Sequence, residues 1–510
     1  MFGELAFGAF SKFKIGSNPI LSVILTFVLM LLSLTVGSLN KIAQLSSVLF
    51  LLSYFTVNLA CLFLEWASAP NFRPKFTGYN ILSCGLGCVG CFVMMIVISQ
   101  LFTAVAWLLL FVCIGIFSFT SGPKYKEWGS IGQALMFHQV RKYLLMMDVR
   151  KDHVKFWRPQ ILLLVSNPRY NCVLIEFINS LKKSGLYVLG HVHVSNFDEL
   201  ASKDPSVTEL PHWLELITHL KVKAFPEITV AKSMREGSQQ LARISGLGAM
   251  KPNTVIFGFG QDGEQKVDQL GGDEKSRFYH GQLKEMFNEC NESQEDNSDR
   301  AIELMKSVGD MIKLEKNVCL ARNFFRLNHD VESTKKFIDV WLIDFFDKPN
   351  YTVSDPGQSF MMQLGTILTM TREWKKFQLR VFVRIMEEED RSAIVRHLEK
   401  TLLELRIPAK VVTMEFKRVF SIVEASGAVQ EDQSRLDIMS IPSEFMEEIN
   451  EIIKLRSKDT IVTFLRLPAP PPSREDKELR RMYELLKIQS NNLPPVIYVH
   501  GLKTVVSASL

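Results

Sequence analysis

Charged side chains are missing from two long stretches near the start of this 510-residue chain. Residues 76–123 contain no Asp, Glu, Lys, Arg or His over 48 positions, and residues 15–40 contain none over 26. A core helix of a soluble protein carries charge on its solvent-facing side, so these stretches exclude a soluble first quarter. A helix needs roughly 20 apolar residues to cross a hydrocarbon core of about 30 Å. The longer stretch therefore predicts two spans, with a break at Ser99-Gln100.

Four membrane spans are predicted in all, at residues 20–37, 43–64, 81–98 and 101–118, within a transmembrane region of residues 1–123. Pro19 lies where the first helix is expected to begin. Lys and Arg precede the first span, lie between the second and third, and follow the fourth, whereas the opposite loops hold only Lys41. By the positive-inside rule, the N-terminus and the C-terminal part are expected in the cytosol.

Cysteine is scarce outside these spans. Five of the eight cysteines lie within apolar segments: Cys61, Cys84, Cys88, Cys91 and Cys113. No disulfide framework is suggested, and a reducing cytosol fits the remaining three. The net charge of +5 is small for this length and argues against a nucleic-acid partner. No small-residue cleavage site follows the first apolar run, so no cleavable signal peptide is expected.

The cysteines of the third predicted span have the spacing of one iron–sulfur motif, Cys84-x3-Cys88-x2-Cys91. They alternate with Gly85, Gly87 and Gly90, and small residues at close spacing usually let helices pack tightly in lipid. We therefore expect helix packing here, with a subunit contact through the glycines as an alternative. No Asp, Glu, Lys, Arg or His lies inside any span, although ion pathways often need such a residue, so no complete transport site is predicted.

Residues 124–159 are predicted to form a connector. Its amphipathic helix, residues 128–147, has Leu135 and Leu145 on an apolar stripe and carries His138, which we interpret as a surface histidine. Beyond it, apolar strand-like runs alternate with helical patterns, which lie at Cys172–Lys183, Met234–Ile244, Phe360–Thr371, Ala393–Leu405 and Lys477–Ser490. The expected strands are Ile161–Val165, Leu186–Val194, Val222–Phe225, Thr254–Phe259, Asn317–Ala321, Phe337–Asp344, Gln378–Val383, Lys410–Met414, Ile461–Leu465 and Val496–His500. This order predicts a mostly parallel, doubly wound α/β domain.

Ten strands over this length favour two lobes, residues 160–325 and 326–510. Residues 261–300 are polar, lack periodicity and are expected to be a mobile insertion of the first lobe.

Three motifs of the α/β part could suggest a ligand site. Ser245–Asn253 is glycine-rich, but a helix precedes it and a strand follows, which is the order of a helix C-cap rather than of a phosphate loop. Ser166–Arg169 follows the first strand, where ligands bind such sheets, yet it lacks glycines. His191 and His193 share one face of a strand, but a zinc site needs more ligands than the sequence shows. We therefore assign no catalytic, cofactor-binding or metal-binding residue.

Many short strings of the sequence resemble the cation-chloride cotransporter family, solute carrier family 12, in the same order. They include Leu64-Glu-Trp-Ala-Ser-Ala-Pro-Asn-Phe-Arg-Pro74, Phe156-Trp-Arg-Pro-Gln160, Gly185-Leu-Tyr-Val-Leu-Gly-His-Val192, Arg235-Glu-Gly237, Ser245-Gly-Leu-Gly-Ala-Met-Lys-Pro-Asn-Thr254, Ile338-Asp-Val-Trp341, Thr463-Phe-Leu-Arg-Leu-Pro468 and Val499-His-Gly501. The resemblance covers essentially the whole chain. It implies an amino-acid/polyamine-transporter-like membrane part followed by a cytosolic domain, with the plasma membrane as the expected location.

The family has twelve spans and binds potassium, sodium and chloride in the earlier ones, whereas the four spans here align with the last four. The resemblance thus implies a fragment or a short isoform that lacks the ion sites. It implies potassium/chloride symport for a full-length form, and a homodimer or a heterodimer with other cotransporters. The alternatives are a non-transporting partner of intact cotransporters and a membrane-tethered enzyme or nucleotide sensor. The last lacks a clustered acid, base or nucleophile, and we expect no enzyme and no cofactor.

Overall fold

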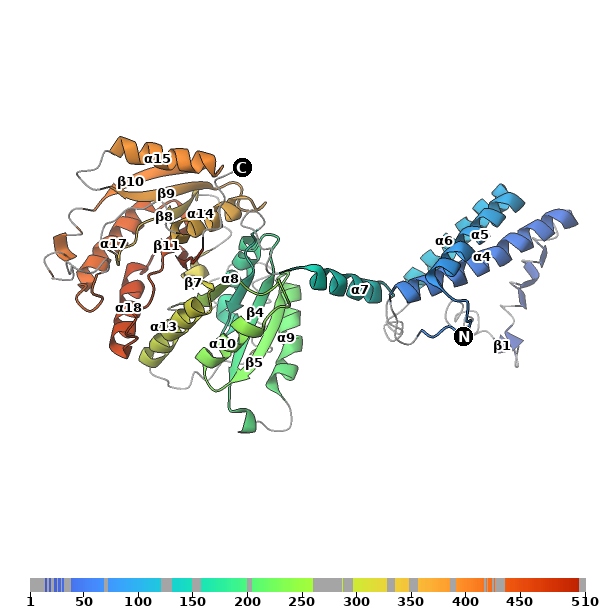
Figure 1. Cartoon of the computed structure of the whole chain (residues 1–510), viewed down its shortest axis with the longest axis horizontal. Helices are drawn as coiled ribbons and strands as arrows, with labels where there is room; N and C mark the ends of the chain where they lie inside the picture. The colour runs from blue at the N-terminus through green and yellow to red at the C-terminus, as the bar shows by residue number, and fades with distance from the viewer. Residues whose placement is uncertain are drawn as a thin grey trace. The chain divides into compact units, whose positions relative to one another are not determined.

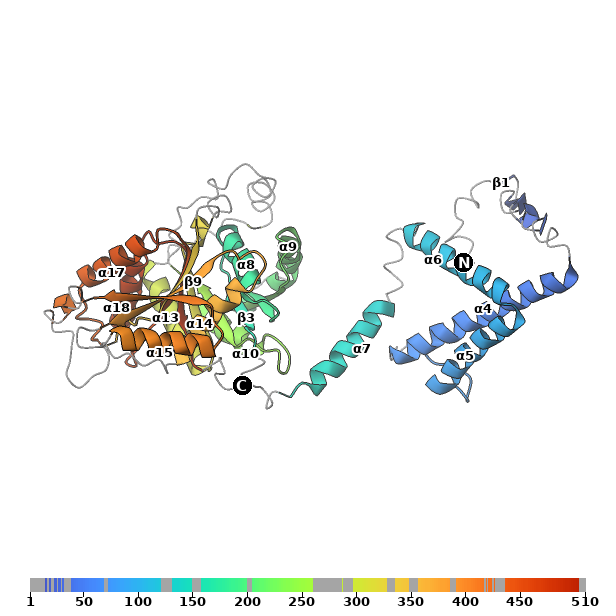
Figure 2. The ribbon, with the colours of Figure 1, turned by 90° about the horizontal axis from the view of Figure 1, so that it is seen from above.

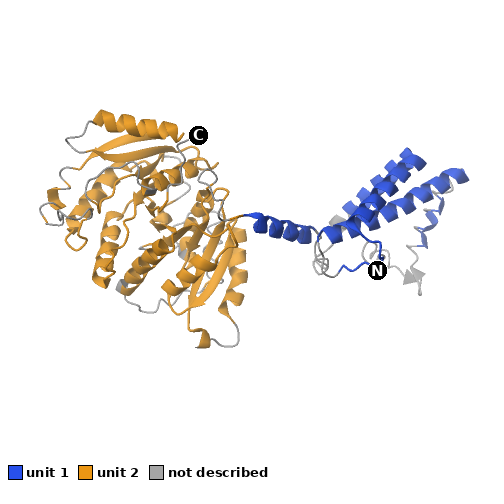
Figure 3. Ribbon diagram, viewed as in Figure 1, with its two compact units in different colours: residues 1–147 blue, residues 148–510 orange. Residues whose placement is uncertain are grey.

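The computed structural model describes residues 38–67, 72–120, 131–148, 157–199, 204–259, 297–327, 335–347, 356–385, 391–416 and 436–503, with a few isolated positions elsewhere. Residues 1–147 and 148–510 form two compact units (Figure 3), here named the apolar unit and the α/β unit.

The apolar unit contains helices α4 (Leu39–Trp66), α5 (Ile81–Ile98), α6 (Gln100–Thr120) and α7 (Ile131–Met146) (Figure 1). Among the described residues, α4 and α5 are long and apolar enough to cross a membrane, and residues 100–115 of α6 form a shorter apolar helix. The first predicted span, residues 20–37, lies largely outside the described residues. The expectation that Pro19 begins a helix is wrong, because Pro19 lies in the two-residue strand β2 (Asn18–Pro19), which pairs antiparallel with β1 (Lys14–Ile15).

The break predicted at Ser99-Gln100 is confirmed. Ser99 has extended backbone angles, φ −167° and ψ 116°, between the end of α5 and the start of α6. The Thr103 hydroxyl oxygen lies 2.7 Å from the carbonyl oxygens of both Met95 and Ser99. Both carbonyl oxygens also accept backbone hydrogen bonds, Met95 from the Ser99 N–H at 3.2 Å and Ser99 from the Thr103 N–H at 3.0 Å, so the Thr103 hydroxyl adds a further contact that ties the end of α5 to the start of α6.

The α/β unit is built on one ten-stranded sheet. Its strands are β3 (Ile161–Leu164), β4 (Tyr187–Val194), β5 (Phe225–Ala231), β6 (Thr254–Gly258), β7 (Asn317–Arg322), β8 (Phe337–Trp341), β9 (Gln378–Ile385), β10 (Ala409–Glu415), β11 (Thr460–Arg466) and β12 (Val496–His500). They lie in the order β10-β9-β8-β11-β12-β7-β6-β3-β4-β5. Each predicted strand is present, but the third is displaced from Val222–Phe225 to β5. Pro226 is accommodated there because β5 lies at the edge of the sheet.

Each half of the sheet repeats one pattern. The first five strands and the last five each follow the order 3-2-1-4-5 with parallel neighbours, and the halves meet at the antiparallel pair β12–β7. The two lobes expected at residues 160–325 and 326–510 are therefore corrected to two halves of one mixed sheet. Strands β12 and β7 are far apart in the sequence, so the local strand pattern does not specify that they pair.

In the described part of the α/β unit, eight helices cover the two faces of this sheet (Figures 1 and 2). The side chains of one core cluster come from α8 (Pro168–Leu181), α9 (Pro205–His219), α14 (Pro356–Thr369) and α15 (Arg391–Glu404). Those of the other come from α10 (Met234–Ile244), α13 (Asn297–Lys313), α17 (Ser443–Arg456) and α18 (Asp476–Gln489). Residues of β3 alternate between the two clusters, so the strand is buried on both faces, as its continuous apolar run predicts. Most of the expected insertion, residues 261–300, lies outside the described residues, but its last four residues belong to α13.

Asp310 on α13 links the two halves on one face. Its carboxylate accepts hydrogen bonds from Arg235 Nη2 at 3.0 Å, Gln239 Nε2 at 2.8 Å and Arg474 Nη1 at 2.9 Å. Burial alone raises the pKa of the Asp310 carboxyl, but the hydrogen bonds from Arg235, Arg474 and Gln239 outweigh it and lower the pKa to about 2.

This shift predicts a pH-dependent contribution to stability. Because the folded pKa lies below the unfolded value of 3.8, the contribution is complete above about pH 4 and is lost as the pH falls towards 2. We expect Asp310→Asn to lower the free energy of unfolding by about 2 kcal/mol at pH 7 and to lose less on acidification than the wild type. Urea unfolding followed by pulse proteolysis at several pH values measures both. Equal acid sensitivity in the two proteins would contradict the assignment.

Candidate functional site

The α4–α5 contact explains the small residues of the third predicted span. Cys84 and Cys88 are buried on α5 against α4, and the Cys88 Sγ lies 3.9 Å from the Phe55 carbonyl oxygen. A Cβ at Gly87 would lie 3.1 Å from the Asn58 side chain, so glycine permits this close approach. Gly85 and Gly90 face open space instead. Cys84, Cys88 and Gly87 thus serve helix packing, as the sequence predicts, whereas the prediction is not met at Gly85 and Gly90.

The segment Ser166–Arg169 leads into α8, and one of its own side chains caps the N-terminus of that helix. The Asn167 side chain accepts a hydrogen bond from the Arg169 backbone N–H at 2.9 Å, and Pro168 stands in the first turn. This is an ordinary helix N-cap, in which the asparagine takes the place that an anion would need.

The segment Ser245–Asn253 closes α10 and leads into β6, as predicted. Gly246 has φ +80°, and a Cβ there would lie 2.2 Å from the Met250 carbonyl oxygen. Only glycine fits this left-handed, crowded position, so the glycine serves the turn rather than a phosphate.

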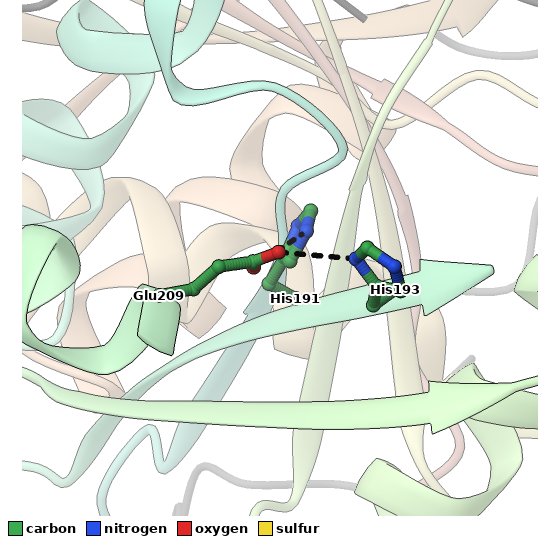
Figure 4. Close-up of side chains that lie close together, drawn as sticks. All are labelled: His191, His193 and Glu209. Atoms are coloured by element: carbon green, nitrogen blue, oxygen red, sulfur yellow. Dashed lines mark hydrogen bonds and ion pairs between the residues drawn. The ribbon is translucent and has the colours of Figure 1, made fainter. Parts of the chain in front are cut away.

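His191 and His193 on β4 meet a third polar side chain, Glu209 on α9 (Figure 4). The distance from His193 Nδ1 to Glu209 Oε1 is 3.0 Å, and that from His191 Nε2 to Glu209 Oε2 is 3.6 Å. The three candidate ligand atoms all lie within 4.8 Å of one another. The exposed fractions of the side chains are 14% for His191, 35% for His193 and 28% for Glu209, so the cluster is open to solvent.

Local structure fixes this arrangement. The alternation along β4 places both histidines on the face that α9 covers. Helix α9 begins at Pro205 after Asp204, whose side chain accepts from the Ser206 N–H at 2.9 Å. Trp213, four residues after Glu209, is buried and lies against the His191 ring with centroids 5.2 Å apart. Glu209 and Trp213 therefore share the helix face that packs on the strand.

The His191 ring is held in one tautomer. Its Nδ1 lies 2.9 Å from the Val165 carbonyl oxygen, which can only accept, so Nδ1 carries the proton and Nε2 has a free lone pair. Burial lowers the pKa of His191; the bond to Val165 and the charge of Glu209 offset this only in part. The ring is thus neutral near pH 7 and presents a lone pair towards a carboxylate.

A basic pocket of about 330 Å³ lies near the amino ends of β8 and β11. Its charged lining residues are Arg326, Lys335, Lys454 and Lys458. Arg326 Nη2 donates to Asn492 Oδ1 at 2.6 Å, and Lys454 pairs with Glu451 at 3.1 Å. The pocket attracts anions in general, but these partners leave no ordered cradle for a particular one.

Two sequence-family matches cover successive parts of the chain. The family described as amino acid permease matches residues 3–163, and solute carrier family 12 matches residues 171–289. Solute carrier family 12 member 9 of Xenopus laevis is 38% identical over 97% of this chain and 56% of its own length. The human protein of that name is 35% identical over 97% of this chain and 57% of its own length.

Two further similarities are more distant. Vacuolar cation-chloride cotransporter 1 of Saccharomyces cerevisiae is 31% identical over 80% of this chain and 38% of its own length. The solved cytoplasmic domain of a prokaryotic cation chloride cotransporter aligns with 68% of this chain at a TM-score of 0.39 and 10% identity.

The apolar helices and these matches define a membrane protein of a transporter class, not of an enzyme class. Within that class, the chain belongs to solute carrier family 12, the cation-chloride cotransporters, as the resemblance implies. The chain spans about half the length of the member 9 proteins that it matches.

Proposed function

We propose that this chain is the regulatory and assembly part of a cation-chloride cotransporter. Its α/β unit lies in the cytosol, and coupled movement of potassium and chloride belongs to a longer form of the protein. The observation that carries the proposal is the combination, in one chain, of uncharged apolar helices and a ten-stranded α/β unit. Helices α5 and α6 contain no Asp, Glu, Lys, Arg or His, and α4 has only Lys41 and Glu65, close to its two ends. Such helices supply a membrane anchor but no evident ion-binding group.

Orientation gives the first test. If the α/β unit is cytosolic, the sequons at Asn291 and Asn350, both outside the described residues, stay unglycosylated. Expression with microsomes followed by glycosidase treatment measures this as a gel shift. A sequon introduced near Lys41, in the loop expected between the first predicted span and α4, serves as the positive control. A shift at Asn291 or Asn350 would reverse the proposed topology.

Assembly is proposed through α7. Leu135 on this helix is half-buried, but Leu145 is 80% exposed, and Phe137 and Tyr143 are also exposed. An exposed apolar helix surface needs a cover of lipid or protein. A second copy, or a full-length cotransporter, is the partner that the family favours.

We expect Leu145→Asp to weaken such a dimer by roughly tenfold or more, since burying a leucine is worth about 1–3 kcal/mol. Cross-linking of the full chain in mild detergent measures the dimer fraction, with Lys142→Asp on the same helix as a charged control. A monomeric wild type would contradict dimer assembly, whereas an unchanged dimer in Leu145→Asp would place the contact elsewhere.

A second candidate function is a non-transporting partner that binds and modulates intact cotransporters. The uncharged helices α5 and α6 support it, because they offer a membrane anchor without a charged ion-binding group. It differs from the first in that binding to an intact cotransporter, rather than ion movement by a longer form, is the activity.

A further inference from the structure

In the cluster of His191, His193 and Glu209, two hydrogen-bond acceptors face each other and repel. Val165 fixes the proton of His191 on Nδ1, so the lone pair of Nε2 points towards Glu209 Oε2 at 3.6 Å. Two acceptors then face each other with no proton between them. A cation between them removes the repulsion, and a divalent metal ion can be bound by all three side chains at once.

We propose that His191, His193 and Glu209 bind a divalent transition-metal ion of the Zn²⁺ type. Two imidazoles and one carboxylate form a donor set that zinc takes readily, with water in the remaining position. The bond between His191 and the Val165 carbonyl is the kind of outer contact that orients a metal-binding histidine and raises its basicity.

The geometry needs only a small adjustment. With metal–ligand distances near 2.0–2.1 Å, tetrahedral ligand atoms lie about 3.3 Å apart. The three atoms here already lie within 4.8 Å of one another, and His193 and Glu209 are more exposed than His191, which gives their side chains room to adjust. Metal binding shifts the remaining His193 proton from Nδ1 to Nε2, which faces away from the carboxylate.

Metal binding would fasten α9 to β4. Helix α9 covers the edge of the sheet at β4 and β5, and Glu209 is its link to the two histidines. The metal ion would thus stabilise this edge of the α/β unit. Helix α9 would then be more ordered when Zn²⁺ is bound than when it is absent.

The chain offers a matched control on the same helix. His219 Nε2 lies 3.7 Å from Glu215 Oε1, at a comparable distance, and among the described residues this pair belongs to no group of three candidate metal ligands. A single His–Glu pair lacks the ligand count for tight binding. His219→Gln therefore removes a His–Glu contact of α9 and leaves the proposed site intact.

The test uses the full chain in mild detergent after removal of metal with a chelator. Zn²⁺ is titrated calorimetrically, and hydrogen exchange of α9 is measured with and without Zn²⁺. We expect one strong site in the wild type and in His219→Gln, and an affinity at least about tenfold weaker in His193→Gln and Glu209→Gln. The protection of α9 from hydrogen exchange should rise with Zn²⁺ in the wild type and in His219→Gln, but not in His193→Gln or Glu209→Gln.

Two results would overturn the proposal. One is a wild type that binds no Zn²⁺ at micromolar concentrations, which would leave the cluster as a hydrogen-bonded contact only. The other is equal binding in all four proteins, which would place the metal on other residues, such as the cysteines of α5. Circular dichroism of the variants without metal shows that each is folded.

Discussion

Replacing Asp339 with asparagine is expected to lower the free energy of unfolding of the α/β unit by about 3–5 kcal/mol. Asp339 lies in the middle of β8 with its side chain fully buried. It accepts two hydrogen bonds from Arg380 on the neighbouring strand, at 2.8 Å and 2.9 Å. The hydroxyls of Ser457 and Thr460 donate to the same carboxylate at 3.0 Å and 2.6 Å. The substitution leaves the largely buried Arg380 cation without its counter-charge, which is why the expected cost exceeds that of an ordinary hydrogen bond.

Urea unfolding of the full chain in mild detergent, read by pulse proteolysis, measures this loss. Asp476→Asn is the matched control, because Asp476 pairs with Lys306 at 2.6 Å but is 62% exposed, and its loss should cost less than about 1 kcal/mol. Adding Arg380→Gln to Asp339→Asn should cost little more, since no unpaired charge then remains. A loss near 1 kcal/mol for Asp339→Asn alone would contradict the structural role assigned to this pair.

The sequence predicts the local parts of the fold well. Continuous apolar runs such as Ile161–Leu164 indicate buried strands, and the missing charges of residues 76–123 locate two helices and the break between them. Both signals depend only on neighbouring residues. Helices α9, α13 and α17 are absent from the prediction. Pro211 interrupts the pattern of α9, and α13 begins inside a polar stretch.

Long-range arrangements could not be predicted in the same way. The antiparallel pairing of β12 with β7 and the partners of Asp339 join positions more than 40 residues apart. Glu209 illustrates the same limit at the candidate metal site. The sequence places His191 and His193 on one face, but nothing in the spacing shows that α9 folds back over them with Glu209 pointing inwards.

We expect that this chain by itself does not move ions. A transport path through a membrane needs polar groups lining it and satisfied backbone at every depth. Helices α5 and α6 contain no Asp, Glu, Lys, Arg or His. In α4, the charged residues are Lys41 and Glu65, which lie close to its two ends.

Chloride-dependent rubidium uptake in cells that express this chain alone tests the claim most directly. Immunoblots of membrane fractions confirm expression, and a full-length cotransporter of the same family is the positive control. We predict uptake equal to that of cells with an empty vector, whereas the positive control takes up rubidium in a chloride-dependent manner. Chloride-dependent uptake that rises with the amount of this chain would contradict the account.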